Sequence, residues 1–173
     1  MLNFKKNSEL NMLRTIIVDD ENHIRRSLAK MLDTFCPNVK LIASSNGVKT
    51  GIKDIQENKP DLVLLDIKMK DGTGFDLLKK LDPVDFKVIF ITAYDQYAIK
   101  AFRCSAIDYL LKPVDPDELV EAIQKTENIL QKDFNIQMEA FQDNIKNESK
   151  ADKKIILKTL DNIYLVKIRD ILY

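Results

Sequence analysis

The stretch Asp61–Asp66 reads DLVLLD, four consecutive apolar residues enclosed by two aspartates. A short run without polar alternation predicts a β-strand that is buried on both faces. Strands of this kind are typical of parallel sheets, whose two faces are covered by helices. The aspartate that ends the run then stands at the carboxyl edge of such a sheet, where open α/β folds bind their ligands.

Similar runs recur on both sides of this strand and alternate with amphipathic stretches. We predict four further strands, at Leu13–Val18, Val39–Ala43, Lys87–Ile91 and Ile107–Leu111. Helices are predicted at Asn22–Phe35, Gly47–Asn58, around Leu77–Leu81, at Gln96–Cys104, and from Pro116 to about Lys132, the last with Asp115 as N-cap. Right-handed crossovers between such elements give a doubly wound α/β domain with a five-stranded parallel sheet and five helices.

Composition narrows the function classes. The 173 residues carry 27 Lys+Arg and 27 Asp+Glu, so no overall basic field exists to hold a nucleic acid. No apolar run approaches the length of a membrane span, and Met1–Met12 lacks the apolar core of a signal peptide. Cys36 and Cys104 have no metal-ligand spacing and fit a reducing compartment. We therefore expect a cytoplasmic protein without membrane contact.

Chemically useful side chains follow four of the predicted strands. Asp19 and Asp20 end the first strand, Asp66 the third, Thr92 the fourth and Lys112 the fifth. Three neighbouring carboxylates repel one another unless a cation is present, and Mg²⁺ binds carboxylate and phosphate oxygens. Lys112 and Thr92 add a positive charge and a hydrogen-bond donor. A nucleophilic aspartate, a metal and such partners are what phosphoryl transfer to a carboxylate requires.

Four segments resemble the signatures of response-regulator receiver domains, which share the flavodoxin-like fold. They are IIVDDE (Ile16–Glu21), LVLLDIKMKDGTGFDLL (Leu62–Leu78), VIFITAY (Val88–Tyr94) and AIDYLLKPV (Ala106–Val114). Thr92–Val114 resembles more narrowly the receivers of LytTR-type (LytR/AlgR family) transcriptional regulators.

The resemblance implies a role for each residue of the cluster. Asp66 takes a phosphoryl group from a sensor histidine kinase, and Lys112, followed by a cis peptide bond to Pro113, pairs with its oxygens. Asp19, Asp20, Asp66 and the backbone carbonyl of Lys68 hold Mg²⁺, with Asp20 the favoured direct ligand. Thr92 and Tyr109 form the switch pair. The chain is then a phosphoryl acceptor that can lose the group again, and not an enzyme in the ordinary sense.

Two features depart from the family pattern. Lys70 replaces the usual proline of the loop after the phosphorylation site. Lys68 and Tyr94 stand two residues after Asp66 and Thr92, at positions that influence dephosphorylation in the family. We expect them to alter water access and thus the lifetime of the phosphorylated form.

The sequence predicts three regions: a receiver at 13–132, a linker at 133–153, and at 154–173 the truncated start of a LytTR DNA-binding domain. The linker is polar with a weak helical pattern, and either extends the last helix or stays a solvated connection. Two alternating runs around Asp161-Asn162 predict a hairpin. Because an isolated hairpin is marginal in water, we expect it to be disordered, paired with another chain, or docked on the receiver.

Partners also follow from the resemblance. Homodimers form through helix 4, strand 5 and helix 5, here with Tyr97, Lys100, Arg103 and Asp117. DNA is contacted only through the missing C-terminal domain.

Three alternatives were weighed against the receiver function. A haloacid-dehalogenase-type hydrolase needs a second aspartate two residues after the nucleophile, where this chain has Lys68. A nucleotide-binding domain lacks its glycine-rich loop after the first strand. A phosphorylation-independent interaction module of receiver fold stays open as the second hypothesis.

Overall fold

Five parallel strands form one sheet, as predicted, and they lie in the order β2–β1–β3–β6–β7. The strands are β1 (Leu13–Val18), β2 (Val39–Ser45), β3 (Leu62–Leu65), β6 (Lys87–Thr92) and β7 (Asp108–Leu111). The computed structural model describes residues 12–97, 106–146, 154–158 and 163–171. By its contacts the chain divides into two units, Met1–Thr126 and Glu127–Tyr173. The first unit contains the sheet.

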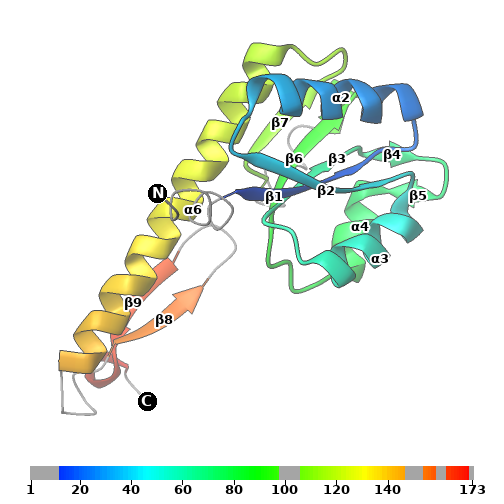
Figure 1. Cartoon of the computed structure of the whole chain (residues 1–173). Coiled ribbons are helices and arrows are strands. Elements are labelled where there is room, and N and C mark those ends of the chain that lie inside the picture. Colours follow the sequence, from blue (N-terminus) through cyan, green and yellow to red (C-terminus); the bar gives the residue numbers. More distant parts are fainter. Residues whose placement is uncertain (1–11, 98–105, 147–153, 159–162, 172–173) are drawn as a thin grey trace. The chain divides into compact units, whose positions relative to one another are not determined.

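Helices cover both faces of this sheet. They are α2 (Asn22–Phe35), α3 (Val48–Asn58), α4 (Gly74–Lys80) and α6 (Pro116–Lys146). The first turns of α6 lie with α2 on one face, and α3 and α4 lie on the other (Figure 1). The doubly wound architecture is thus confirmed, with four α-helices in the described residues instead of the five predicted. Most of the predicted helix Gln96–Cys104 lies outside them, and Asp95–Tyr97 form a short 3₁₀ turn.

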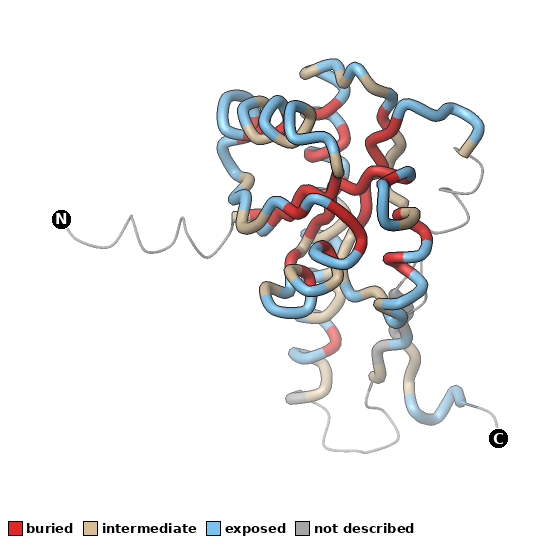
Figure 2. The backbone as a smooth tube through the Cα atoms, turned by 90° about the vertical axis from the view of Figure 1, so that its right-hand side faces the viewer, coloured by how far each residue is buried: buried red, intermediate tan, exposed pale blue. Residues whose placement is uncertain are grey.

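The core lies along the central strands, where the buried residues concentrate (Figure 2). All four residues of β3 are at most 1% exposed, and β3 pairs with β1 on one side and β6 on the other. Burial of a Leu or Val side chain stabilises a fold by about 1.5–3 kcal/mol. The uninterrupted apolar run therefore takes the most buried place in the sheet, and it positions Asp66 directly at the end of a rigid strand.

A short hairpin after β3 shapes the loop beyond Asp66. Its strands are β4 (Lys68–Met69) and β5 (Gly72–Thr73), and Gly72 has the positive φ of 146° that favours glycine. Asp71 at its tip accepts hydrogen bonds from the backbone N–H groups of Val48 (2.8 Å) and Lys49 (3.0 Å), at the start of α3. This helix needs a cap from elsewhere because Gly47 at its N-cap has no side chain.

The last helix is longer than predicted. It begins at Pro116, where Asp115 Oδ1 accepts a hydrogen bond of 2.8 Å from the N–H of Asp117 and so confirms the predicted cap. It continues to Lys146, so the predicted end near Lys132 was wrong, and the weak helical pattern beyond that residue reflects a real helix. The described residues of the predicted linker, 133–146, are helical.

The second unit contains the rest of α6 and a two-stranded antiparallel sheet of β8 (Lys154–Lys158) and β9 (Ile163–Lys167). This confirms the predicted hairpin; its turn at 159–162 lies outside the described residues. Asn144 exchanges two hydrogen bonds with the backbone of Lys154, and the Lys154 ammonium lies 2.5 Å from Asp143 Oδ2 and 3.3 Å from Glu139 Oε1. Within this unit the hairpin is thus attached to α6, a contact the sequence did not predict.

No helix in the described part of the chain combines the length and apolar character needed to cross a membrane.

The cap of α3 can be tested by replacing Asp71. Asp71→Ala leaves two helix N–H groups without their partner and is expected to lower the free energy of unfolding by about 1 kcal/mol. Bonding to the N–H groups of Lys49 and Val48 holds the pKa of Asp71 below its ordinary value of 3.8. The stabilisation is therefore present above pH 3.8 and disappears as the pH falls through the lowered pKa.

Urea unfolding at neutral and acidic pH measures this effect, with Asp85→Ala, an exposed carboxylate outside any helix, as control. Equal stability of the two variants at neutral pH would contradict the capping role.

Candidate functional site

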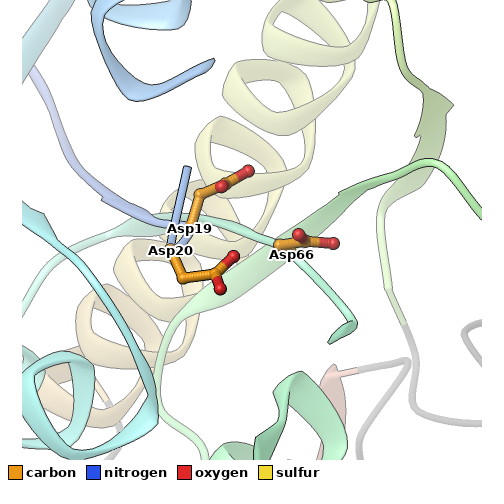
Figure 3. Close-up of side chains that lie close together, drawn as sticks. All are labelled: Asp19, Asp20 and Asp66. Carbon is orange, nitrogen blue, oxygen red and sulfur yellow. The ribbon is translucent and has the colours of Figure 1, made fainter. Parts of the chain in front are cut away.

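Three carboxylates meet at the carboxyl edge of the sheet. Asp19 and Asp20 follow β1, and Asp66 follows the neighbouring strand β3. One oxygen from each can be chosen so that all three lie within 4.8 Å of one another (Figure 3). Asp19 and Asp66 are buried and Asp20 is half-buried. The carboxylates that the sequence analysis placed together are therefore brought together by the pairing of β1 with β3.

Backbone groups hold these side chains in place. Asp19 Oδ1 accepts a hydrogen bond of 2.7 Å from the N–H of Glu21. Asp20 Oδ2 accepts one of 3.1 Å from the N–H of Lys70. The N–H of Asp66 in turn donates to the carbonyl of Val18 at 2.8 Å, which extends the ladder between β1 and β3 to the site itself.

Lys112 brings its ammonium group into this cluster from the end of β7. Its Nζ lies 2.9 Å from Asp66 Oδ2, 2.7 Å from Asp19 Oδ2 and 3.0 Å from Glu21 Oε1, and the side chain is only 8% exposed. The shortest of these contacts joins Lys112 to the buried Oδ2 of Asp19 in an ion pair. The peptide bond from Lys112 to Pro113 is cis, as predicted.

The burial and the charges shift the pKa values of these groups in different directions. Burial raises the pKa of Asp19, against the opposing effect of its bond to Lys112. Burial also acts to lower the pKa of Lys112, but bonds to Asp19, Asp66 and Glu21 outweigh it and raise that pKa well above its ordinary value. The Lys112 ammonium lowers the pKa of the more exposed Glu21. Lys112 is therefore a permanent cation held by carboxylates.

The acidic cluster fits a hard divalent cation. It offers oxygen ligands only, which is the donor set that Mg²⁺ prefers. Burial disfavours the charged form of Asp19, so a cation at the three carboxylates would relieve that cost. Lys112 supplies a single positive charge to three acidic side chains, which leaves negative charge for a metal to balance.

Thr92 lies on β6, the neighbour of β3, and Tyr109 lies on β7, the edge strand beyond it. Thr92 ends β6, is fully buried, and its hydroxyl has no hydrogen-bond partner within the described residues. Tyr109 lies on β7 and is half-buried, and its hydroxyl donates to the backbone carbonyl of Tyr94. Burial raises the pKa of Tyr109. Tyr109 is thus attached to the loop that follows Thr92.

Lys68 and Tyr94 are in contact. The Lys68 ammonium lies 4.9 Å from the centre of the Tyr94 ring, a cation–π distance. Tyr94 also contacts Tyr97, and Tyr97 contacts Phe75, with 6.2 Å between ring centres in each pair. Aromatic rings therefore connect this pair to the core through Phe75. The structure places the ammonium group of Lys68 here, and the predicted metal contact of its backbone carbonyl stays a prediction.

Three contributors to the site were not identified from the sequence. Glu21 shares Lys112 with the predicted residues, and Arg25 Nη1 donates to the backbone carbonyl of Asp19 at 2.7 Å. Gly74 packs so closely that a Cβ there would lie 2.5 Å from the carbonyl oxygen of Asp66. Glu21 directly follows the acidic pair and could have been included, whereas the contacts of Arg25 and Gly74 depend on tertiary packing.

A family model described as the response regulator receiver domain matches residues 15–124. Among curated proteins, the chain is 34% identical over 165 residues to the sensory transduction protein LytT of Bacillus anthracis, covering 94% of this chain and 65% of that protein. It is 44% identical over 120 residues to an uncharacterized response regulatory protein of Vibrio parahaemolyticus, covering 69% and 49%. The chain thus spans about half to two-thirds of the length of these relatives.

Solved receiver structures resemble the first unit. The receiver domain of AraT, a response regulator from Geobacillus stearothermophilus, is 28% identical with a TM-score of 0.65, and the match covers 70% of this chain and 98% of that one. The response regulatory domain of mrkE from Klebsiella pneumoniae is 27% identical with a TM-score of 0.63, over 69% and 98%. The predicted receiver fold is confirmed by these likenesses.

Proposed function

Because this chain belongs to the response-regulator receiver family, we propose that it accepts a phosphoryl group on Asp66 from a sensor histidine kinase, and that Mg²⁺ assists the transfer. The observation that carries the assignment is the position of Lys112, which lies 2.9 Å from Asp66 Oδ2 inside the acidic cluster. Asp66 follows β3, the central strand of the sheet, and its carboxylate lies beside both Lys112 and the two carboxylates after β1.

The transfer itself is a displacement at phosphorus. A carboxylate oxygen of Asp66 forms a bond to phosphorus while the bond from phosphorus to the kinase histidine nitrogen breaks, and that nitrogen keeps the electron pair. Asp19, Asp20 and Asp66 would hold the cation, which when bound balances the charge of the phosphoryl oxygens. Lys112 remains charged throughout and donates to a phosphoryl oxygen in exchange for one of its present carboxylate partners.

Thr92 and Tyr109 would convert this chemistry into a conformational change. The hydroxyl of Thr92 is buried without a hydrogen-bond partner in the described part of the chain, which is an unfavourable state for a polar group. A phosphoryl oxygen on Asp66 offers it an acceptor. Movement of Thr92 toward that oxygen would change the space beside Tyr109. The Tyr109 side chain would then have two competing positions: the present one, in which its hydroxyl bonds to the Tyr94 carbonyl, and one packed beside the moved Thr92.

The output that we propose is control of transcription. Relatives named LytT match over 94% of this chain, which is more than the receiver match at residues 15–124. Residues 154–173 would belong to a LytTR DNA-binding domain, and DNA would be contacted through that domain. A cytoplasmic location follows from the partnership with a kinase.

We also propose a homodimer through the predicted helix at 96–104, strand β7 and the start of α6. Of its residues, Tyr97 is half-buried and Asp117 is exposed, whereas Lys100 and Arg103 lie outside the described residues.

Two alternatives remain weaker. Hydrolysis of external phosphate esters would lack the carboxylate two residues after the nucleophile, because that position is Lys68, whose ammonium group contacts Tyr94. A phosphorylation-independent interaction module would not need a lysine shared among buried carboxylates, which costs desolvation.

Incubation with acetyl phosphate and Mg²⁺ tests the assignment directly. We expect the intact mass to rise by one phosphoryl group in the wild-type chain and in Asp85→Asn, an exposed carboxylate away from the site. The adduct should be absent in Asp66→Asn and after removal of the metal. A folded wild-type protein that takes up no phosphoryl group would instead support the interaction module.

The lifetime of the phosphorylated form should depend on the Lys68–Tyr94 pair. A cation–π contact of a partly exposed side chain contributes about 0.5–1 kcal/mol, so loss of the ring is expected to speed hydrolysis by roughly twofold to fivefold as water gains access to Asp66. Loss of the phosphoryl adduct with time, followed in Tyr94→Ala and Tyr94→Phe, measures this. Tyr94→Phe keeps the ring and should behave like the wild type; a Tyr94→Ala lifetime unchanged from the wild type would sink the idea.

A further inference from the structure

The second unit carries an apolar stripe on the C-terminal part of α6. Phe134, Met138 and Phe141 are 56%, 38% and 60% exposed, although all three are large apolar side chains. Together with Ile145 they make up the apolar stripe, and the successive residues 134, 138, 141 and 145 are four, three and four positions apart. This 3.5-residue period is the heptad pattern of a helix that packs along another helix, with Met138 and Ile145 at a and Phe134 and Phe141 at d.

The hairpin of this unit does not use the apolar stripe. It is attached through Glu139, Asp143 and Asn144, which bind Lys154. Ala140, on the same part of the helix surface as Glu139, Asp143 and Asn144, is 2% exposed. Glu139, Ala140 and Asp143 stand at b, c and f, away from the a and d positions, whereas Asn144 at g borders the stripe. β8 therefore contacts a different side of α6 from the apolar stripe. The stripe therefore keeps its exposure while the hairpin is in place.

The residues beside the apolar stripe suit an identical partner. The e and g positions from 135 to 144 are Asn135, Gln137, Gln142 and Asn144, all neutral amides. The charged residues of this part of the helix fall at b, c and f, away from the seam: Lys132, Asp133, Glu139, Asp143 and Lys146. Two copies of this face can thus meet without like-charge repulsion, and no charged partner is selected by it.

We propose that the apolar stripe is the seam of a homodimer, in which residues 131–145 of two copies form a parallel two-stranded coiled coil. In a parallel pair, Gln131 at an a position meets its own copy and the two amides can bond. In an antiparallel pair a positions face d positions, so a register that sets Phe134 against Met138 would place Gln131 against Phe141 and bury an amide against an apolar ring. The two-fold axis then runs along the helices.

This assembly goes beyond the proposed signalling function. It uses the C-terminal part of α6 and not the residues proposed for the receiver dimer surface, Tyr97 and Asp117, and nothing in the seam depends on the charge at Asp66. The coiled coil is therefore expected in the absence of phosphorylation, and it would hold two chains together before any signal arrives.

Sedimentation equilibrium of the full chain without a phosphodonor tests the seam. We expect a mass of twice 20.0 kDa at micromolar concentration. The double variant Phe134→Glu/Phe141→Glu places charges at two exposed positions, so it should leave the fold intact, as circular dichroism would verify, and raise the dimer Kd at least about tenfold. Phe35→Glu is the matched control, because Phe35 is 51% exposed on α2, and should leave the dimer unchanged.

A cross-linking experiment checks the orientation. Phe134→Cys should form a disulfide-linked dimer under mild oxidation, and Lys132→Cys, at the outward b position, should not; both variants retain the same native cysteines. A monomeric wild-type chain at these concentrations would overturn the proposal and leave the apolar stripe to a further segment of a longer chain or to another protein. A dimer that persists in the double variant, or equal cross-linking at both positions, would overturn it as well.

Discussion

The ammonium group of Lys112 and the carboxylates around it form the interaction on which the site depends. Its Nζ lies within 3.0 Å of oxygens from Asp19, Glu21 and Asp66. Asp19 and Glu21 follow β1 and Asp66 follows β3, whereas Lys112 follows β7 at the edge of the sheet. Without a cation these groups would repel across a buried space. The lysine neutralises only part of their charge. A metal ion and a phosphoryl group, which bring opposite charges, can therefore enter together at little net electrostatic cost.

The surrounding backbone fixes the position of the loop that carries Asp66. Buried β3 fixes the start of the loop that carries Asp66, and Gly74 lets α4 begin against the Asp66 carbonyl, where any larger residue would collide. Asp71, at the tip of the same loop, is bonded to the start of α3. The loop beyond Asp66 is thus held at both its ends, and the Asp66 carboxylate follows directly on a buried strand. Beside it, Thr92 is buried without a partner within the described residues, which leaves one group ready to change its position.

Much of the fold could be predicted because local pattern and burial agree. The run at 62–65 is uniformly apolar since both its faces are covered, and the aspartates and Lys112 end strands whose parallel pairing collects them. The sequence was less informative where distant contacts decide. The C-terminal part of α6 was not predicted with certainty, because its apolar residues are exposed and the amphipathic pattern there is weak. The attachment of the hairpin through Lys154 joins residues at least ten positions apart. The Lys68–Tyr94 contact likewise arises from packing.

Calorimetric titration of the unphosphorylated chain with Mg²⁺ measures whether these carboxylates bind a divalent cation. We expect a single site, strongly weakened in Asp20→Asn, since Asp20 is the least buried of the three carboxylates and is not paired with Lys112. Asp85→Asn should bind as the wild type does. A site of equal affinity in Asp20→Asn, or no saturable binding in the folded wild-type chain, would contradict the account.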